Sequence, residues 1–449
     1  MCWYFTVAPS NRKTVAEKLI TIVSKEASKI PDFRKRLNED SIPLHDAIMS
    51  GLAVMHLKYP SLLQFDRDCV KKPSKLRNLK SLYRVGQVPC DTYLREMLDP
   101  IETRYFRKFF TQLFAFVQRS GRLRQFEYFD EGYLVPIDGT GHFSSGKIDC
   151  PECCIKKPNS KSPQYYHQLL ACCLVKPGKK EVLPLMPEPI IQQVDASKND
   201  CEKTALKRLL SNISREHPHL KLVLNFDDLY SDGPTIKLVK SYGYSFVMVA
   251  KDTSHASLYG TVDELDKAGK VERYQFTDEK GYQHWFRFVN GAPINKSHKE
   301  TLVNYLEYVE TDPKGRKYVN TWITDIQLTQ ENVAKVMRGG RAKWKIENET
   351  FNTLKTQGYH LEHNYGHGKQ HLATNLACLT FTAFLIDQIE QLACKFFQQA
   401  LEAKKSKKAL WHAIRGLFDW FTIDNWEDVF TAITEGRSAS LKHLVVDTT

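Results

Sequence analysis

Three carboxylates occupy positions from which they could share one metal-dependent site: Asp138, Asp227 and Glu347. Each aspartate follows a short apolar run typical of a buried strand, and the glutamate lies in a basic stretch with helical spacing. Hard divalent cations prefer carboxylate oxygens, and Mg²⁺ usually takes only a few protein ligands beside water and phosphate. Two such ions can activate a water or a 3′-hydroxyl and stabilise the leaving oxygen. The set therefore predicts metal-dependent chemistry on a phosphate backbone.

The glutamate belongs to residues 341–355, which we interpret as a basic amphipathic helix. Three of its apolar residues recur at helical spacing and are expected to face the core: Trp344, Phe351 and Leu354. Glu347 shares a side of this helix with Lys343, four residues earlier. A carboxylate held among cations on a rigid helix suits a metal ligand beside a phosphate backbone. The alternative is a solvated face with ion pairs four residues apart.

The two aspartates come from a region that alternates strand-like and helix-like patterns. Apolar runs predict strands over 133–138, 164–175, 181–185, 220–227 and 244–250. Helices are predicted over 200–215 and from 231 onward. This order indicates an α/β fold with a mixed sheet flanked by helices. Asp138 ends the first strand and Asp227 ends the fourth, and the two carboxylates would meet if these strands are adjacent.

Other patterns flank this region and interrupt it. Short β runs separated by turn residues predict a β-rich insertion whose last run returns to the core. Residues 1–125 are a DNA-binding module or, alternatively, a helical lid. Residues 372–401 are expected to form one long amphipathic helix. We predict a helical region (1–125), the first part of the core (126–251), the insertion (252–325), the second part of the core with the glutamate (326–400) and a C-terminal helical region (401–449).

Composition restricts the partners and the compartment. The chain has 449 residues, of which 42% are hydrophobic, so it can bury the cores of several domains. Its net charge of +12 favours a polyanion such as nucleic acid, with acidic substrates and membrane surfaces as alternatives. Eleven cysteines and no secretory signal over residues 1–5 indicate thiols or metal ligands in a reducing cytoplasm. The longest apolar run, 376–386, is too short to span a bilayer.

The three acidic segments together resemble those of the DDE transposases of bacterial insertion sequences. Residues 133–140 resemble the first-aspartate segment of that family, and residues 225–234 resemble the second. Residues 343–347 resemble the Arg-Trp-x-Ile-Glu core of the third segment. The similarity spans about residues 90 to 390 and matches the group that has a β-rich insertion before the catalytic glutamate.

The resemblance implies an RNase H-like core in which Asp138, Asp227 and Glu347 are the catalytic and metal-binding residues. It further implies two Mg²⁺ or Mn²⁺ ions, cleavage at the ends of the element and strand transfer into target DNA. The implied partners are the terminal inverted repeats and the target DNA. A homodimer in the synaptic complex is implied as well, and no membrane is involved.

The chain departs from the Tyr-x2-Arg-x3-Glu-x6-Lys signature of that family. Gly340 stands in the tyrosine position and Lys343 in the arginine position. Leu354 takes the lysine position, with Lys355 one residue later. The cations expected to contact DNA phosphates are Lys343, Lys345, Lys355 and Lys369.

Other acids compete for the same roles. Asp228 adjoins Asp227, which we prefer because the predicted strand ends just before it. Glu349 competes with Glu347, which we prefer because of the Trp-x-Ile frame before it. Glu202 begins a predicted helix that carries a further active-site acid in RNase H-like nucleases. The alternative role for an acid at that position is compensation of the helix dipole.

Cysteine and histidine residues form a second candidate site. Four residues have the spacing of zinc ligands: Cys150, Cys153, His167 and Cys172. Buried thiols and a histidine in a sheet are the alternative. Glycines interrupt any helical metal stripe along His363, His367 and His371, which could instead contact phosphate together with Lys369.

Two tryptophans in the predicted insertion, Trp285 and Trp322, are candidates for stacking on a flipped base, with core packing as the alternative. The predicted function is a DNA transposase that cleaves element ends in a metal-dependent reaction and joins them to target DNA. The alternatives are a non-catalytic DNA-binding derivative and an RNase H-like, structure-selective nuclease, which would cleave without joining.

Overall fold

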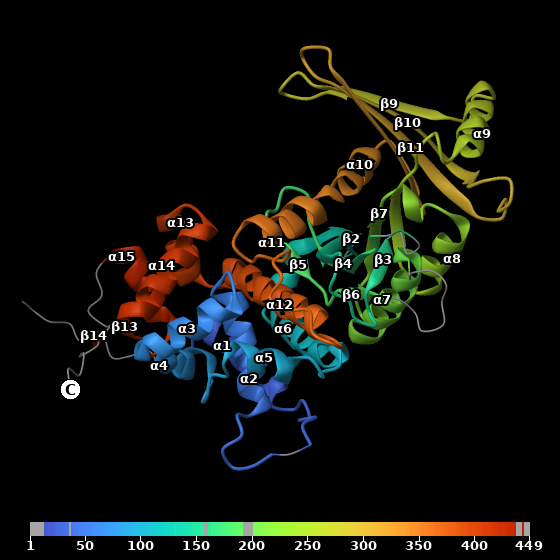
Figure 1. Cartoon of the computed structure of the whole chain (residues 1–449). Helices are drawn as coiled ribbons and strands as arrows, with labels where there is room; N and C mark the ends of the chain where they lie inside the picture. The colour runs from blue at the N-terminus through green and yellow to red at the C-terminus, as the bar shows by residue number, and fades with distance from the viewer. Residues whose placement is uncertain are drawn as a thin grey trace, which may run out of the picture. The chain divides into compact units, whose positions relative to one another are not determined.

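The computed structural model describes residues 13–35, 37–130, 132–156, 160, 162–191, 201–436 and 442–443. The expectation for residues 1–5 and the predicted helix start at residue 200 lie outside these ranges. Within them the chain has a mixed α/β structure with many helices and a 12-stranded sheet, as predicted for the class (Figure 1). The chain divides into a helical unit (Met1–Ser120, Ile148–Pro151 and Leu354–Thr449) and a sheet unit (Gly121–Lys147 and Glu152–Thr353).

The N-terminal part of the helical unit confirms the predicted helical region. Its helices are α1 (Val15–Ala27), α2 (Leu44–His56), α3 (Leu62–Lys71), α4 (Pro73–Tyr83), α5 (Asp91–Leu98), the 3₁₀ turn η1 (Thr103–Phe106) and α6 (Arg107–Arg119). Helix α1 begins with a capping box in which Thr14 and Glu17 each bond the other's backbone N–H. Its apolar face, which includes Leu19 and Val23, is buried.

The C-terminal part of the helical unit is built around one buried helix. The elements are α12 (Leu372–Ala393), α13 (Lys395–Lys404), α14 (Lys407–Trp420), α15 (Trp426–Glu435) and a small ladder of β13 (Phe421–Thr422) with β14 (Lys442–His443). The single amphipathic helix predicted over 372–401 is wrong. The helix is interrupted at Cys394, which has an extended backbone conformation. Helix α12 is buried on all sides because it is apolar all round. Although α12 is long and apolar enough to cross a membrane, its apolar window is entirely buried, as in the core helix of a soluble protein.

Helix α12 carries a buried charged network. The Asp387 carboxylate lies 3.0 Å from Nε2 of His56 and 2.8 Å from Nζ of Lys58, and it accepts a hydrogen bond from the Tyr359 hydroxyl. One turn later, the carboxyl oxygens of Glu390 are buried and have no hydrogen-bond partner among the described residues. Burial raises the pKa of Glu390 well above its ordinary value. Burial acts the same way on Asp387, but Lys58 and His56 outweigh it and lower the pKa of that carboxyl to about 2.

The sheet unit has the predicted adjacency of its first and fourth strands. Its first strands are β1 (Glu127–Phe129), β2 (Gly132–Ser145), β3 (Cys154–Lys156), β4 (Gln164–Leu174), β5 (Leu183–Pro184), β6 (Glu188–Ile190), β7 (Leu222–Phe226) and β8 (Ser245–Val249). The sheet order is β3-β4-β2-β7-β8, where β2, β7 and β8 are parallel and β4 is antiparallel to β2. The helical elements of this part are η2 (Arg122–Phe126), α7 (Glu202–Glu216), η3 (Asp228–Tyr230) and α8 (Gly233–Ser241).

The insertion extends the same sheet. After α9 (Ala256–Lys267), which we did not predict, the strands β9 (Glu272–Thr277), β10 (Gln283–Pro293), β11 (Leu302–Thr311) and β12 (Lys317–Thr324) form an antiparallel meander (Figure 1). Strand β12 pairs antiparallel with β8, with Ile323 opposite Met248. The prediction that the last run of the insertion returns to the core is therefore confirmed.

The glutamate lies in a broken helix. Helix α10 (Val333–Arg341) precedes the helix predicted over 341–355, which is interrupted: a turn at 342–343 is followed by the π-helical turn η4 (Ile346–Asn352) and by α11 (Thr353–Thr356). The wider π turn and the break before it shift the phase of the side chains. Phe351 and Leu354 are buried as predicted, whereas Trp344 is 45% exposed, so its predicted core position is wrong.

Candidate active site

Asp138 lies where β2 parts from β7. Pro136 is the last residue of β2 in register with β7, whereas Asp138 is paired with Ala171 of β4. Strand β2 does not end at Asp138 as predicted, because its antiparallel pairing with β4 continues to Ser145. The Oδ1 atom of Asp138 accepts a hydrogen bond from its neighbour's N–H, and Oδ2 lies 2.9 Å from Nζ of Lys343.

Asp227 follows β7 directly. Its Oδ1 accepts a hydrogen bond from the backbone N–H of Leu229 at 3.0 Å and caps η3. Pro136 and Asn225 are opposite each other in the parallel β2–β7 pair, so Asp138 and Asp227 each stand two residues beyond this matched pair. Parallel strands therefore bring both aspartates to the same end of the sheet, as the sequence predicts.

Lys343 connects the third predicted acid to the first. Its Nζ lies 2.9 Å from Asp138 and 3.2 Å from Oε1 of Glu347, and only 13% of its side chain is exposed. Burial lowers the pKa of Lys343, but the two carboxylates outweigh burial and raise it. The ammonium is therefore charged at neutral pH and neutralises part of the acidic cluster. Glu347 itself is exposed, with 58% of its side chain open to solvent.

Glu202 joins this cluster from the first turn of α7. Its Oε2 accepts a hydrogen bond from the hydroxyl of Tyr230 at 2.9 Å. Burial raises the pKa of the Glu202 carboxyl, and the negative charges of Asp138 and Asp227 raise it further. Burial likewise raises the pKa of Asp227, with a contribution from Asp138 that Lys343 opposes. These mutual effects place Glu202 in electrostatic contact with both aspartates.

The donor set fits a hard divalent cation. The acidic side chains of the cluster offer carboxylate oxygens, which Mg²⁺ and Mn²⁺ prefer over the thiolates and imidazoles that favour zinc. Burial is the main cause of the raised pKa values of Asp227 and Glu202, and neighbouring carboxylates add to it while Lys343 opposes it. Asp138, Asp227 and Glu347 are the residues that would hold such ions, with Glu202 as an additional donor.

The competing acids have other partners. Asp228 accepts hydrogen bonds from the backbone N–H of Lys251 at 2.8 Å and from the hydroxyl of Ser254 at 2.5 Å. Its carboxylate therefore holds the turn after β8. Glu349 lines a neighbouring cavity together with Lys345. Neither acid has a described contact with Lys343, whereas Asp138 and Glu347 both do.

The remaining predicted DNA-contacting cations differ in their availability. Lys345 is buried, and its Nζ donates to the backbone carbonyl of Lys179 at 2.7 Å, so phosphate binding there would require this bond to break. Lys355 pairs with Glu362 at 2.7 Å. Lys369 is exposed, and its backbone N–H donates to Asp99.

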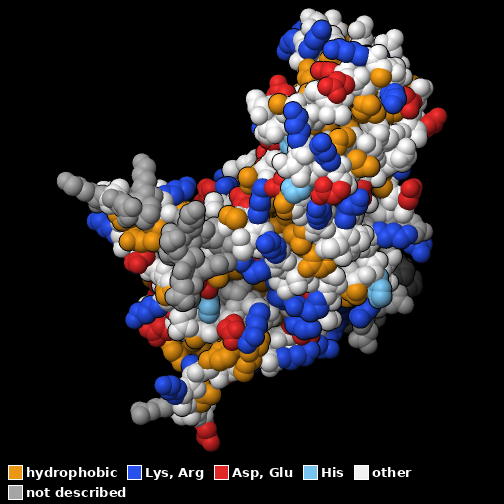
Figure 2. Space-filling view, turned by 90° about the vertical axis from the view of Figure 1, so that its right-hand side faces the viewer, with side chains coloured by type: hydrophobic (Ala, Val, Ile, Leu, Met, Phe, Trp, Pro, Cys, Tyr) orange, Lys and Arg blue, Asp and Glu red, His pale blue; other side chains and the backbone are white. Residues whose placement is uncertain are grey.

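A cavity of about 580 Å³ lies in the sheet unit beside η4. Its lining combines aromatic and basic side chains, among them Phe276, His284, Tyr308, Arg338, Arg341, Trp344 and Lys180, with the acids Asp278, Glu310 and Glu349. Bases stack on aromatic rings and phosphates pair with cations, so this lining suits a single-stranded nucleic acid. Lys and Arg side chains are spread over the face drawn in Figure 2, interspersed with acidic and apolar ones, in keeping with the dispersed positive charge.

Trp322 does not have the exposure that base stacking requires, and Trp344 does not have the burial that the sequence predicts. Trp322 is 1% exposed and packs against Gly340, where an added Cβ would lie 2.5 Å from its Nε1. Base stacking by Trp322 is therefore excluded, and its indole leaves no room for a side chain at position 340. Trp285 is half-buried on β10. The exposed indole beside the cavity is that of Trp344, which the helical pattern assigned to the core.

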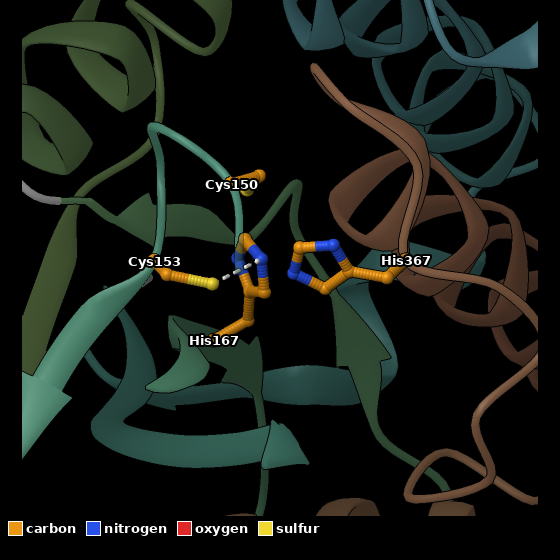
Figure 3. A group of neighbouring side chains, drawn as sticks. All are labelled: Cys150, Cys153, His167 and His367. Carbon is orange, nitrogen blue, oxygen red and sulfur yellow. Dashed lines mark hydrogen bonds between the residues drawn. The ribbon is translucent and has the colours of Figure 1, made fainter. Parts of the chain in front are cut away.

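Two of the four predicted zinc ligands lie together in the sheet unit, where the Cys153 thiol is 3.4 Å from Nε2 of His167 (Figure 3). Cys150 belongs to the helical unit. Cys172 is buried in β4 opposite Ile137.

No family model matches the chain, and no curated protein matches its sequence.

Proposed function

We propose that this protein is a DNA transposase with a DDE-type active site. The observation that carries the proposal is the convergence of Asp138, Asp227 and Glu347 around the ammonium of Lys343 in the sheet unit. The sheet supports it further, because an RNase H-like core places its first and fourth strands side by side, as β2 and β7 are here. The antiparallel β4 and the parallel β8 complete the expected arrangement around them.

The chemistry follows from the positions of these side chains. Asp138 and Asp227, with Glu347, would hold two Mg²⁺ or Mn²⁺ ions, which supply activation of the attacking oxygen and stabilisation of the leaving oxygen. Hydrolysis of a phosphodiester at the element end frees a 3′-hydroxyl. That hydroxyl then attacks a phosphodiester of the target, so that one P–O bond forms as another breaks. Two such ends require two active sites, which supports a homodimer on DNA.

Lys343 has a definite part in this scheme. It holds Asp138 and Glu347 together through its ammonium, although η4 and β2 are far apart in the sequence. With divalent cations held by the carboxylates, the ammonium of Lys343 would be able to contact a non-bridging phosphate oxygen. Lys343 would therefore take the role that arginine has in the family signature. Its ammonium is a single compact charge, whereas a guanidinium presents several N–H donors in one plane.

Labelled duplexes that carry the two flanking element ends test the proposal in the presence of Mg²⁺ or Mn²⁺. The wild type should nick these ends and join them to a target plasmid. Glu347→Gln should lower both activities by about 100-fold or more. Glu349→Gln, two residues away, is the matched control and should keep both activities. Equal loss in the two variants, or cleavage that survives Glu347→Gln, would contradict the proposed site.

The same assay separates the alternative functions. Nicking without joined product would identify a structure-selective nuclease that uses the same carboxylates. Specific binding of the ends without cleavage in any variant would identify a non-catalytic DNA-binding protein. Both outcomes would overturn the transposase proposal.

A further inference from the structure

Three side chains of the helical unit bring buried polar atoms to one place: His56, Asp387 and Glu390. All three are completely buried, and one ligand atom of each lies within 4.8 Å of those of the other two. The atoms without a hydrogen-bond partner among the described residues include Nε2 of His56, Oδ1 of Asp387 and both carboxyl oxygens of Glu390. Burying a polar atom without a partner is costly. Four such atoms in one cluster therefore suit a ligand that they share.

Two packed helices position these side chains. Asp387 and Glu390 are three residues apart on α12, so both carboxyl groups lie on one face of that helix. His56 is the last residue of α2, which packs against α12. All three residues belong to the helical unit, so the cluster is complete within one compact part of the chain.

The other polar atoms of His56 and Asp387 are held by neighbours. Nδ1 of His56 lies 2.7 Å from the hydroxyl of Tyr83, and donation to this hydroxyl would leave Nε2 unprotonated, as a metal ligand must be. Oδ2 of Asp387 lies 2.8 Å from Nζ of Lys58 and accepts a hydrogen bond from the hydroxyl of Tyr359. Nε2 of His56 and Oδ1 of Asp387 are 3.0 Å apart, but they lack the geometry of a hydrogen bond.

We propose that His56, Asp387 and Glu390 bind one Zn²⁺ ion inside the helical unit. One imidazole with two carboxylates is a donor set that zinc accepts, whereas Mg²⁺ prefers oxygen donors alone. Two ligands of one ion lie about 3.0–3.4 Å apart when each is about 2.0–2.1 Å from it, so His56 and Asp387 already have a suitable separation. A water could complete the tetrahedron. Because the three ligands are completely buried, the ion would have a structural role, joining the end of α2 to α12.

The ammonium of Lys58 beside the cluster is compatible with a divalent ion. Its Nζ lies over the rings of Tyr359 and Trp411, at 3.9 Å and 4.2 Å from their centroids. Burial lowers the pKa of Lys58 to about 8, so this side chain can release its proton when an ion takes over the charge of Asp387. Two carboxylates would then balance the two charges of the ion, and the aromatic rings would still enclose the neutral amine.

The zinc content of the purified full-length protein, grown with added zinc, tests this site without any DNA. Glu390→Gln replaces one ligand by an uncharged side chain of the same size, so it should contain about one zinc per chain less than the wild type. The matched control is Glu402→Gln on α13 of the same unit, where the glutamate is exposed, and its zinc content should equal that of the wild type. Equal zinc in the wild type and Glu390→Gln, or a zinc-free wild type, would overturn the proposal.

X-ray absorption at the zinc edge identifies the ligands in the wild type, even if a variant does not fold. The spectrum should contain nitrogen and oxygen neighbours at about 2.0–2.1 Å, with the outer-shell scattering of an imidazole. Sulfur neighbours at about 2.3 Å in place of this shell would assign the zinc to cysteines and contradict the proposed ligands. Neither measurement involves cleavage or strand transfer, so the zinc site and the proposed function can fail separately.

Discussion

Glu202 occupies the space that a side chain at position 139 would need: a Cβ added to Gly139 would lie 2.4 Å from its Oε1. The glycine next to Asp138 is therefore what allows the acid of α7 to approach strand β2. The backbone dihedral φ of Gly139 lies outside the left-handed region, so this requirement for glycine is one of space, not of backbone conformation.

Gly139→Ala is expected to displace Glu202 and to lower metal-dependent cleavage by about tenfold or more, in parallel with Glu202→Gln, if Glu202 assists the proposed site. The control is Gly141→Ala, two residues along the same strand, where the nearest atom to an added Cβ is 3.9 Å away. That variant should keep both activity and melting temperature. Full activity in Gly139→Ala would restrict Glu202 to compensating the dipole of α7 and bonding Tyr230.

Asp227→Asn should raise the melting temperature of the metal-free protein at pH 7 while abolishing cleavage. The folded state raises the pKa of Asp227, mainly through burial, so its stabilising contribution is complete below the unfolded pKa of about 4. That contribution is lost as the pH rises through the folded pKa, and asparagine removes the loss while still capping η3. We expect an increase of about 1–4 °C in chelator, because solvent screens part of the repulsion.

Thermal unfolding monitored by fluorescence checks this prediction. Addition of Mg²⁺ should stabilise the wild type and leave Asp227→Asn unchanged, because the variant lacks one ligand of the proposed ions. At about pH 4 the stability difference between the two metal-free proteins should vanish. A metal-free variant less stable than the wild type at pH 7 would show that Asp227 has a structural role.

Trp344→Ala should weaken the binding of single-stranded DNA with little effect on folding. The indole is exposed beside a cavity lined by aromatic and basic side chains, and base stacking contributes about 1–3 kcal/mol per base. We therefore expect a roughly 5- to 150-fold weaker Kd in fluorescence anisotropy. Trp420→Ala is the control, because Trp420 is more exposed, at 72%, and belongs to the helical unit. Equal affinities of the two variants would exclude the cavity as a binding surface.

Asp387→Asn should destabilise the protein by about 3–5 kcal/mol, because it leaves the buried ammonium of Lys58 without its counter-charge. Glu390→Gln, three residues later on α12, should change the stability of the metal-free protein little, since burial raises the pKa of that carboxyl well above its ordinary value and so favours its neutral form. Chemical denaturation with urea measures both values. A large loss in Glu390→Gln would show that Glu390 is ionised in the folded protein.

The sequence predicted the elements whose signal is local. The strand that contains Val135 and the strand that contains Leu224 are continuous apolar runs, and their parallel pairing placed Asp138 and Asp227 at one end of the sheet. The strand boundary at Asp138 was wrong because the glycines that follow it resemble a turn. In the structure these residues extend β2 along β4.

Features that lack a regular local sequence pattern could not be predicted. The exposure of Trp344 follows from a π-helical turn, which an assumed spacing of 3.6 residues per turn cannot show. Helix α9 was missed because turn residues surround it and only Leu258 and Val262 bury an apolar face.

The pairing of β8 with β12 also affects how the chain folds. Backbone bonds and the contacts of Thr324 and Asp325 with Phe246 join segments that are about 75 residues apart. During synthesis β8 is complete long before its neighbour emerges, so its edge stays open to pairing with other chains. Closure of such a long loop is slow compared with local contacts. Truncated or stalled chains that end within the insertion should therefore aggregate, and the sheet reaches its native width only after residue 324 leaves the ribosome.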